Sequence, residues 1–314
     1  WIELDLKYPR EIGGVQLRWD DAMNGLTYDI LGSIDGKKYD TLHSVIEGKG
    51  GPVLIFTPES EAQFVRLSLH GNQSHIPYRL EEMSIVPSES LSTSNHFIEH
   101  LALSAPKGWY PRYFLHQASY WTVVGVPSDP KEALFSEDGS FEVDKQHFSI
   151  EPFITLENGP LLTWANAKCE QSLESGYIPI PTVKRIYDGV TLSVTLLASG
   201  EPNHSALLAR YVLKNTSMQY ERGALYLALR PFQVNPTYQW LNFEGGFART
   251  DSISIQRNRA VVGEKSVIVS DRPDAAAATH INGGEVIEHI ATRRLPQAAK
   301  VIDPIGMASA AFQY

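Results

Sequence analysis

Tight-turn dipeptides divide this chain into short segments. Glycine follows Asp or Asn at six places, and such pairs tolerate the positive φ angles of a hairpin turn. The six pairs are Asn24-Gly25, Asp35-Gly36, Asp138-Gly139, Asn158-Gly159, Asp188-Gly189 and Asn282-Gly283. Most are flanked by β-branched or aromatic runs, whereas helical periodicity is scarce. The chain is therefore predicted to be almost all-β. The best helix candidate is Pro273 to His280, where Asp271 is a candidate cap for four consecutive alanines.

Length and charge narrow the class of protein. The 314 residues exceed one ordinary domain and predict two, and 43% apolar with 20% charged residues is typical of globular chains. A formal net charge of -9 argues against nucleic acid as a partner, because phosphate binding needs a clustered basic surface. The sequence has no apolar run of about 18 residues, so no membrane span is expected.

Cysteine content and the two ends bear on location. Cys169 is the sole cysteine, which excludes a disulfide framework and fits the cytosol or a bacterial export route that does not rely on disulfides. The chain begins at Trp1 inside one predicted strand and closes on Gln313-Tyr314 inside another. We therefore expect residues before Trp1 and after Tyr314, and any leader peptide would lie upstream.

The stretch from Leu207 to Phe247 organises the second half of the chain. Two apolar runs, Leu207 to Leu213 and Ala224 to Leu229, flank a polar turn and predict paired antiparallel strands. In the second run one face carries leucines and the other carries mixed residues. The leucine face is Leu225, Leu227 and Leu229, and the opposite face is Tyr226, Ala228 and Arg230.

A loop after this strand is the main candidate site. Pro231 ends the strand because it has no amide proton for the ladder, and Tyr238, Trp240 and Glu244 follow before Gly245-Gly246. Aromatics beside carboxylate and guanidinium groups, here including Arg230, suit a concave site for a polar ligand. The same residues would also serve to plug the edge of a large sandwich, or to dock a neighbouring domain.

Residues 1–86 form the first predicted unit, and the polar, Ser-rich residues 87–95 are predicted as a linker. In WIELDL the residues Ile2, Leu4 and Leu6 alternate with polar positions, as in a half-buried strand. The ordered segments WIELDL, PREIGGVQLRW, YDILGSIDGKKY, QFVRLSL and LEEMSIV resemble the discoidin family, also called the coagulation-factor five/eight type C domain.

The discoidin resemblance implies a jelly-roll β-sandwich whose loops at one end bind sugars, lipids or proteins. In bacterial relatives attached to carbohydrate-active enzymes, sugar is the usual ligand. The family pattern has further strands and loops before the position of Trp1, so its ligand-contacting and calcium-binding loops cannot be carried over, and a calcium ion is left open. The candidate rim residues at hand are Asn72, His75 and Tyr78.

Residues 96–314 form the second predicted unit, with more than ten strands. Around YWTVVGVPSD, LLTWANA, GYIPIPTV, ALRPFQVNP and EGGF it resembles the N-terminal β-supersandwich of multidomain glycoside hydrolases and phosphorylases, which has galactose-mutarotase-like topology. That resemblance implies a helical α/α catalytic toroid beyond Tyr314. It also implies an extracellular or periplasmic location in bacteria rather than a cytoplasmic one.

No catalytic or metal constellation stands out. His96-Phe97-Ile98-Glu99-His100 matches the H-x-x-E-H zinc spacing, but a predicted linker precedes it and predicted strands follow, so we expect no zinc. Glycosidic cleavage needs two carboxylates at a defined separation, which sequence spacing in a sheet cannot set. The carboxylates near aromatics are Asp188, Asp251, Glu151 and Glu244, and the candidate histidine partners for Glu244 are His116, His147 and His204.

Aromatic residues are dense between positions 109 and 121 and would suit a stacking platform for sugar rings or packing at a seam between the units. They are Trp109, Tyr110, Tyr113, Tyr120 and Trp121. We expect a two-unit fragment of a larger carbohydrate-active protein, with glycan and a downstream helical domain as partners. The alternatives left open are a sugar epimerase or lyase acting in the sandwich cleft, and a non-enzymatic adhesion or scaffold protein.

Overall fold

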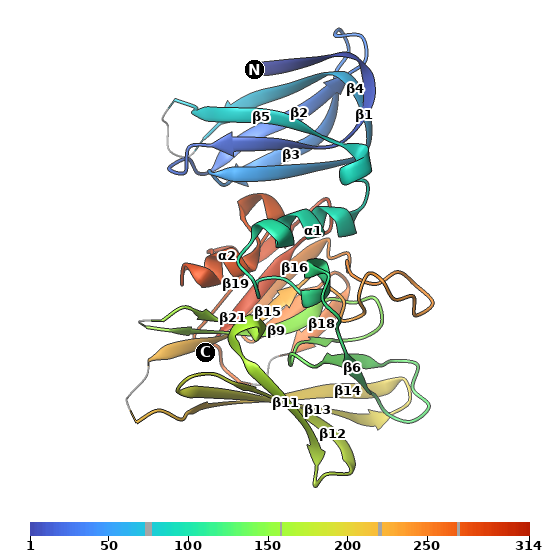
Figure 1. Ribbon diagram of the computed structural model, residues 1–314, viewed down its shortest axis with the longest axis vertical. Coiled ribbons are helices and arrows are strands. Elements are labelled where there is room, and N and C mark those ends of the chain that lie inside the picture. Colours follow the sequence, from blue (N-terminus) through green and yellow to red (C-terminus); the bar gives the residue numbers. More distant parts are fainter. Residues whose placement is uncertain (73–76, 158, 219–221, 269–270) are drawn as a thin grey trace. The chain divides into compact units, whose positions relative to one another are not determined.

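The structure is a computed structural model that describes residues 1–72, 77–157, 159–218, 222–268 and 271–314. The chain divides into two compact units, residues 1–101 with 282–284, and residues 102–281 with 285–314. Antiparallel strands dominate both units, which confirms the all-β prediction (Figure 1). The described part of the chain also holds two α-helices, α1 (Ser94–Ser104) and α2 (Val286–Ala291). Neither of these helices is long and apolar enough to cross a membrane.

The first unit is a five-stranded antiparallel sheet in the order β3-β2-β4-β1-β5. Its strands are β1 (Ile2–Trp19), β2 (Leu26–Ser33), β3 (Asp40–Gly48), β4 (Pro52–Gly71) and β5 (Leu80–Pro87). β1 and β4 are long and carry register shifts, between Asp5 and Arg10 and between Ile12 and Gly14 on β1. Bulges bend a strand. The β1–β4 pair is therefore bent near its middle, and the parts of the pair before and after the bend enclose one core.

Core packing in the first unit depends on close backbone approach at the bend. Gly14 lies against β4, where an added Cβ would stand 2.4 Å from the carbonyl oxygen of Ile55. Only glycine allows that approach. The enclosed core contains residues from both halves of the long strands and from β2 and β3: Val15, Leu17, Trp19, Tyr28, Ile30, Val45, Val53, Ile55, Val65 and Leu67.

The predicted linker is more ordered than its composition indicated. Residues 87–95 include the 3-10 helix η1 (Ser88–Ser90) and the first two residues of α1. Leu91 is fully buried, and its side chain fills the space beside Gly13 and Gly14. Assignment of residues 1–86 to a discoidin-like module and of residues 96–314 to a supersandwich stays a prediction.

The second unit contains three antiparallel sheets. The largest has the order β19-β21-β15-β9-β8-β7-β6, with β10 also on β9. Its strands are β6 (Trp121–Val124), β7 (Ala133–Ser136), β8 (Phe141–Glu142), β9 (Ser149–Leu156), β10 (Leu161–Leu162), β15 (Gly223–Arg230), β19 (Ala275–Thr279) and β21 (Ser309–Gln313). We call it the large sheet.

Two four-stranded sheets complete the unit. One has the order β11-β12-β13-β14, and the other β18-β17-β16-β20. The first comprises β11 (Lys168–Glu174), β12 (Ile178–Ile186), β13 (Val190–Glu201) and β14 (His204–Asn215). The second comprises β16 (Ser252–Gln256), β17 (Arg259–Val262), β18 (Lys265–Ile268) and β20 (Lys300–Ile302).

The large sheet is the middle layer of the second unit. Its leucine face on β15 packs into the main core together with Leu192, Val194 and Leu196 of β13. Its opposite face, with Tyr226 and Ala228, packs against the apolar side of α2. Figure 1 shows this order of α2, large sheet and β11–β14 sheet. The alternation expected along β15 is therefore correct.

Two sequence-based expectations are wrong. The runs 207–213 and 224–229 do not pair with each other: β14 pairs with β13, whereas β15 pairs with β9 and β21. The two strands therefore belong to different sheets. The alanine run is the strand β19 rather than a helix, because it completes the edge of the large sheet, where Ala277 and Ala278 are buried. Tertiary packing here overrides helix propensity.

Four of the tight-turn pairs connect consecutive strands, with the glycine at positive φ. These glycines are Gly25, Gly36, Gly139 and Gly189. Asn282-Gly283 instead lies in the 3-10 helix η4 (Ile281–Gly283), and Asn158 lies outside the described residues. Three of these turns close hairpins of paired strands, β2–β3, β7–β8 and β12–β13, whereas the turn at Gly25 connects β1 and β2, which do not pair with each other.

Candidate functional site

The loop of residues 231–248 follows β15 and is closed by its own backbone. Phe232 and Phe247 form an isolated bridge, and the amide of Gln233 donates to the carbonyl of Gly246 at 2.7 Å. The amide of Ala248 donates to the carbonyl of Pro231 at 2.8 Å. These bonds tie the two ends together, so the loop is a compact excursion with a fixed base.

The Gln233 side chain and the close packing of Gly245 also hold the base of the loop together. The Gln233 amide nitrogen donates to the carbonyls of Glu244 and Phe247, at 3.0 and 2.8 Å. Gly245 lies against Pro236, where an added Cβ would be 2.3 Å from the carbonyl oxygen of Pro236. The Gly245-Gly246 pair is therefore a packing requirement of the loop.

The tip of the loop is exposed. Tyr238 is 60% exposed and Trp240 71% exposed, and Glu244 is exposed as well. The Tyr238 hydroxyl accepts a hydrogen bond of 2.9 Å from the backbone amide of Ser119. The tip therefore presents two aromatic side chains to solvent on a closed loop, and one of them is anchored to a neighbouring segment.

Arg230 lies beneath this loop and is completely buried. Its guanidinium donates to Glu151 at 2.9 Å and makes two bonds of 3.0 Å to the Glu285 carboxylate. A further bond of 2.6 Å runs to the carbonyl of Trp109. With its donors occupied and no exposed surface, Arg230 supports the site from below and does not face a ligand.

Electrostatics explain why this buried charge is tolerated. Burial by itself lowers the pKa of Arg230, because it disfavours the charged guanidinium. The negative charges of Glu151 and Glu285 have the larger combined effect, so the pKa of Arg230 is raised. Burial also raises the pKa of Glu151, although Arg230 acts in the opposite direction. Glu285 is further stabilised because its carboxylate caps α2, accepting from the amide of Ile287 at 2.9 Å. Paired charges of this kind are costly to separate.

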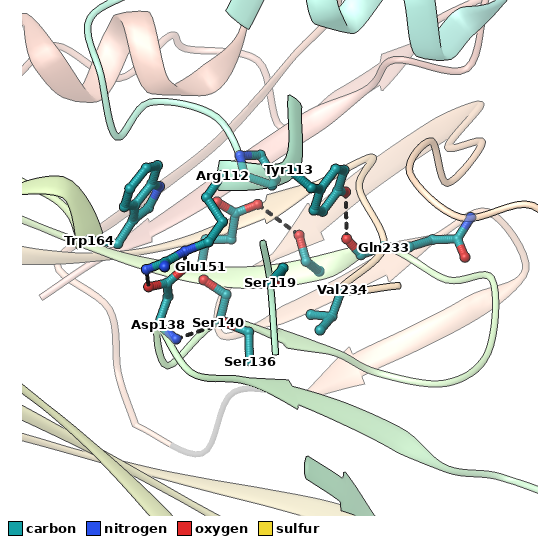
Figure 2. A pocket seen from close by; sticks show the side chains of 12 residues that line it. Arg112, Tyr113, Ser119, Ser136, Asp138, Ser140, Glu151, Trp164, Gln233 and Val234 are labelled. Atoms are coloured by element: carbon teal, nitrogen blue, oxygen red, sulfur yellow. Dashed lines mark hydrogen bonds and ion pairs between the residues drawn. The ribbon is translucent and has the colours of Figure 1, made fainter. Parts of the chain in front are cut away.

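A small cavity lies beside this network (Figure 2). Its volume is ≈ 20 Å³, which is enough for about one water molecule and far too small for a sugar ring. Figure 2 shows Arg112 reaching toward Asp138 on one side, and the Tyr113 hydroxyl bonded to the carbonyl of Gln233 on the other. The lining residues are Pro111, Arg112, Tyr113, Ser119, Ser136, Asp138, Ser140, Ser149, Glu151, Trp164, Gln233 and Val234.

Arg112 connects this cavity to the hairpin turn of β7 and β8. Its guanidinium makes a bidentate ion pair with Asp138, contacts Glu137 at 3.1 Å and lies over the Trp164 ring at 4.9 Å. The Asp138-Gly139 turn thus serves two purposes, because it closes the hairpin and supplies the carboxylate.

Glu142 is a second buried carboxylate near the loop. Its Oε2 accepts from the amides of Val234 and Asn235, at 2.8 and 3.2 Å. Burial raises the pKa of Glu142 to about 7, despite these amide bonds. The group therefore holds the start of the loop in place and titrates near neutrality.

Two of the candidate rim residues of the first unit, Asn72 and Tyr78, are partly buried. Tyr78 is half-buried, and its ring packs 6.2 Å from that of Trp19 at the edge of the core. Asn72 is half-buried too. His75 lies outside the described residues. The structure does not bring these residues together with those of the 231–248 loop in one compact unit.

Several aromatics predicted as a platform are core residues. Tyr110 and Tyr113 are buried, and Trp109 packs against the cluster around α2. Tyr120 is exposed and Trp121 is half-buried. Tyr120 is therefore the exposed member of this aromatic segment, and Trp109 and Trp121 are both half-buried.

The described residues offer no metal cluster built from three or more His, Cys, Asp or Glu side chains. In the H-x-x-E-H segment, His96 contacts the hydroxyl of Ser92 at 3.0 Å and His100 contacts the carbonyl of Ser90 at 3.1 Å. These bonds use the histidines to fix the start of α1. Among the described residues that line the small cavity, no histidine faces a carboxylate.

Sequence reasoning singled out Arg230 and the loop tip but missed the partners that fix them. Glu285, Arg112 and Gln233 carry no motif, and Glu151 was noted only as one carboxylate among several. A detectable signal for Glu285 is the pattern Glu285-Val-Ile-Glu288, which resembles a capping box at a helix start. For Arg112 the sequence contains no comparable indication.

Comparisons with known proteins give little further guidance. No family model matches the chain, and no curated protein shows significant similarity to it. Among solved structures, it is similar to a truncated AlyQ with CBM32 and alginate lyase domains, at 10% sequence identity and a TM-score of 0.24. That match covers 99% of this chain and 88% of the other. At such a low TM-score the likeness carries no argument about ligand or activity.

Proposed function

We propose that this protein is a non-catalytic, carbohydrate-binding and structural portion of a larger carbohydrate-active enzyme. The observation that carries the proposal is the exposure of Tyr238 and Trp240 on a loop whose base is hydrogen-bonded shut. A pyranose ring has an apolar C–H face that stacks on an aromatic side chain. Because the loop is closed before ligand arrives, binding costs little ordering entropy.

Supporting groups around the tip suit the same ligand. Glu244 is exposed beside the aromatics and is a hydrogen-bond acceptor for sugar hydroxyls. Arg230 joins β15, from which the loop departs, to the neighbouring strand β9, and Glu142 holds the start of the loop. In this proposal the buried charges position the tip, and the tip contacts the glycan.

The assignment of each unit to a family, and of the parent enzyme to a type, rests on the sequence resemblances. We propose a discoidin-like first unit, a supersandwich second unit and a parent enzyme of glycoside hydrolase or phosphorylase type. Its helical catalytic domain would be a partner of this chain, and its location would be extracellular or periplasmic. Calcium in the first unit is part of the same proposal.

A glycan array tests the binding claim. The chain is applied with and without calcium, together with Trp240→Ala and Tyr78→Ala variants. We expect binding that Trp240→Ala abolishes and Tyr78→Ala retains, because Trp240 is exposed whereas Tyr78 packs on Trp19. Binding lost only with Tyr78→Ala would move recognition to the first unit. Absence of binding to every glycan would contradict a carbohydrate-binding role.

The non-catalytic claim has a separate test. An oligosaccharide that binds on the array is incubated with the wild-type chain, and the products are followed by mass spectrometry. We expect the oligosaccharide to remain intact. Cleavage, epimerisation or an unsaturated product would overturn this part of the proposal and would favour an enzyme acting in the sandwich.

A further inference from the structure

A second and larger cavity lies in the second unit, between the open edges of two sheets. Its volume is ≈ 370 Å³. It is bounded by β6 and β7 of the large sheet and by β11 and β12 of the four-stranded sheet. We call it the edge cleft. Its lining residues are Thr122, Phe135, Ser136, Gln171, Ser172, Leu173, Pro181, Thr182 and Val183.

Strand register explains why this space stays open. On β11 and β12, Leu173 pairs with Pro181 and Gln171 with Val183, so these side chains share one face. Val183 is buried in the main core, and that face therefore points toward the large sheet. Leu173 is nevertheless 42% exposed, although its face points toward the large sheet, whose edge strand β6 has only four residues.

The chemistry of the lining is polar but uncharged. Thr122 and Gln171 offer a hydroxyl and an amide group that both donate and accept hydrogen bonds. The Thr182 hydroxyl is already bonded to that of Thr195 at 2.7 Å, on the other face of the sheet. Phe135, Leu173 and Pro181 supply apolar surface in the same cleft. A ligand with many hydroxyl groups and apolar C–H faces matches this combination. None of the lining residues is charged, so a carboxylate entering the cleft would give up part of its hydration without gaining a charged partner, which is unfavourable.

The size of the edge cleft also suits a ligand site. Ligand sites of proteins begin at about 300 Å³, and the edge cleft passes that threshold whereas the small cavity near Arg230 does not.

We propose that the edge cleft binds a neutral sugar residue and rejects uronates. This inference rests on the proposed carbohydrate-binding function and adds a second contact site with a stated selectivity. The two sites lie on one segment of chain, since Ser119 anchors Tyr238 and Thr122 lines the edge cleft. The loop tip supplies aromatic stacking, and the edge cleft supplies selection for neutral hydroxyl-bearing rings.

Isothermal titration of the full chain tests the selectivity. The probes are a neutral oligosaccharide that binds on the array and a uronate oligosaccharide of equal length. Gln171→Ala is expected to lower the affinity for the neutral probe about tenfold, which corresponds to the loss of one or two hydrogen bonds. Glu170→Gln is the matched control, because this exposed neighbour points to the other face of β11 and pairs with Lys168.

A second variant, Thr122→Trp, fills the edge cleft from the opposite sheet and is expected to abolish binding of the neutral probe. Its melting temperature is compared with wild type to confirm folding. Unchanged affinity in both Gln171→Ala and Thr122→Trp, with loss in Trp240→Ala, would overturn the edge-cleft inference and leave the proposed function standing. Equal or tighter binding of the uronate would overturn the selectivity. No binding by wild type would overturn both proposals.

Discussion

The Tyr238 hydroxyl is bonded to the backbone amide of Ser119, 119 residues away in sequence, at 2.9 Å. This bond joins the tip of the 231–248 loop to the segment that leads into β6. It accounts for an aromatic ring that is exposed and still held in one place. Exposed aromatics on fixed supports are what ligand stacking requires.

Removing that hydroxyl should loosen the tip without harming the fold. In Tyr238→Phe the ring remains, but the amide of Ser119 loses its acceptor. We expect glycan affinity to fall about three- to tenfold, while the free energy of unfolding changes by about 1 kcal/mol or less. Titration calorimetry and urea unfolding measure the two effects. An unchanged affinity would show that anchoring of Tyr238 is irrelevant to binding.

Closure of the loop base can be tested at Gly245. In Gly245→Ala the new Cβ would meet the carbonyl oxygens of Pro236 and Asn235, so the backbone must shift. We expect a loss of about 1–3 kcal/mol in stability and a clear loss of glycan affinity, measured by urea unfolding and titration calorimetry. Gly71→Ala is the control, since an added Cβ there meets nothing within 4 Å. Equal effects of both substitutions would argue against a packing requirement at Gly245.

The sequence predicted some of these features and not others, for a physical reason. Alternation along β15 and the Asx-Gly turns are local properties; the alternation is confirmed, and three of the Asx-Gly pairs, at Asp35, Asp138 and Asp188, close hairpins of paired strands. Strand partners are long-range, so pairing of β15 with β9 and β21 could not be derived from the nearest apolar run. The same holds for Arg230, whose partners Glu151 and Glu285 lie 79 and 55 residues away. The sequence left open whether Arg230 contacts a ligand or docks a neighbouring domain, because its burial is set by those distant carboxylates.

The buried ion network should dominate the stability of the second unit. Arg230→Met leaves Glu151 and Glu285 buried without their cation, and we expect a loss of about 3–5 kcal/mol. Differential scanning calorimetry of the full chain measures it. Arg249→Met is the matched control, because the Arg249–Asp251 pair is solvent-exposed and should contribute about 0–1 kcal/mol. Similar small losses in both variants would contradict the account of Arg230.

Glu142 should make stability depend on pH near neutrality. Its native pKa of about 7 lies above the usual value of 4.5, so the folded state binds the proton more tightly than the unfolded chain. Its stabilising contribution is full below about pH 4.5 and is lost as pH rises toward 7. The rise from 4.5 to about 7 is about 2.5 pKa units, and at about 1.4 kcal/mol per unit the change in unfolding free energy is about 3.5 kcal/mol.

Glu142→Gln should flatten this dependence. The difference in unfolding free energy between the variant and wild type is measured at several values between pH 4.5 and 8. Burial raises the pKa of Glu151 too, and that group remains in both proteins, so it cancels in the difference. Glu174→Gln, at an exposed position, should leave the profile unchanged. If Glu142→Gln does not alter the dependence of unfolding free energy on pH, the raised pKa of Glu142 is contradicted.

The central claim is that glycan binds at the tip of the 231–248 loop, and the most direct test compares two tryptophans. Trp240 is 71% exposed at the tip, and Trp1 is 72% exposed in the other unit. The dissociation constant for an array-identified oligosaccharide is measured for wild type, Trp240→Ala and Trp1→Ala. The account predicts at least a roughly tenfold weakening for Trp240→Ala and wild-type affinity for Trp1→Ala. Weakening by Trp1→Ala alone, or by neither, would contradict it.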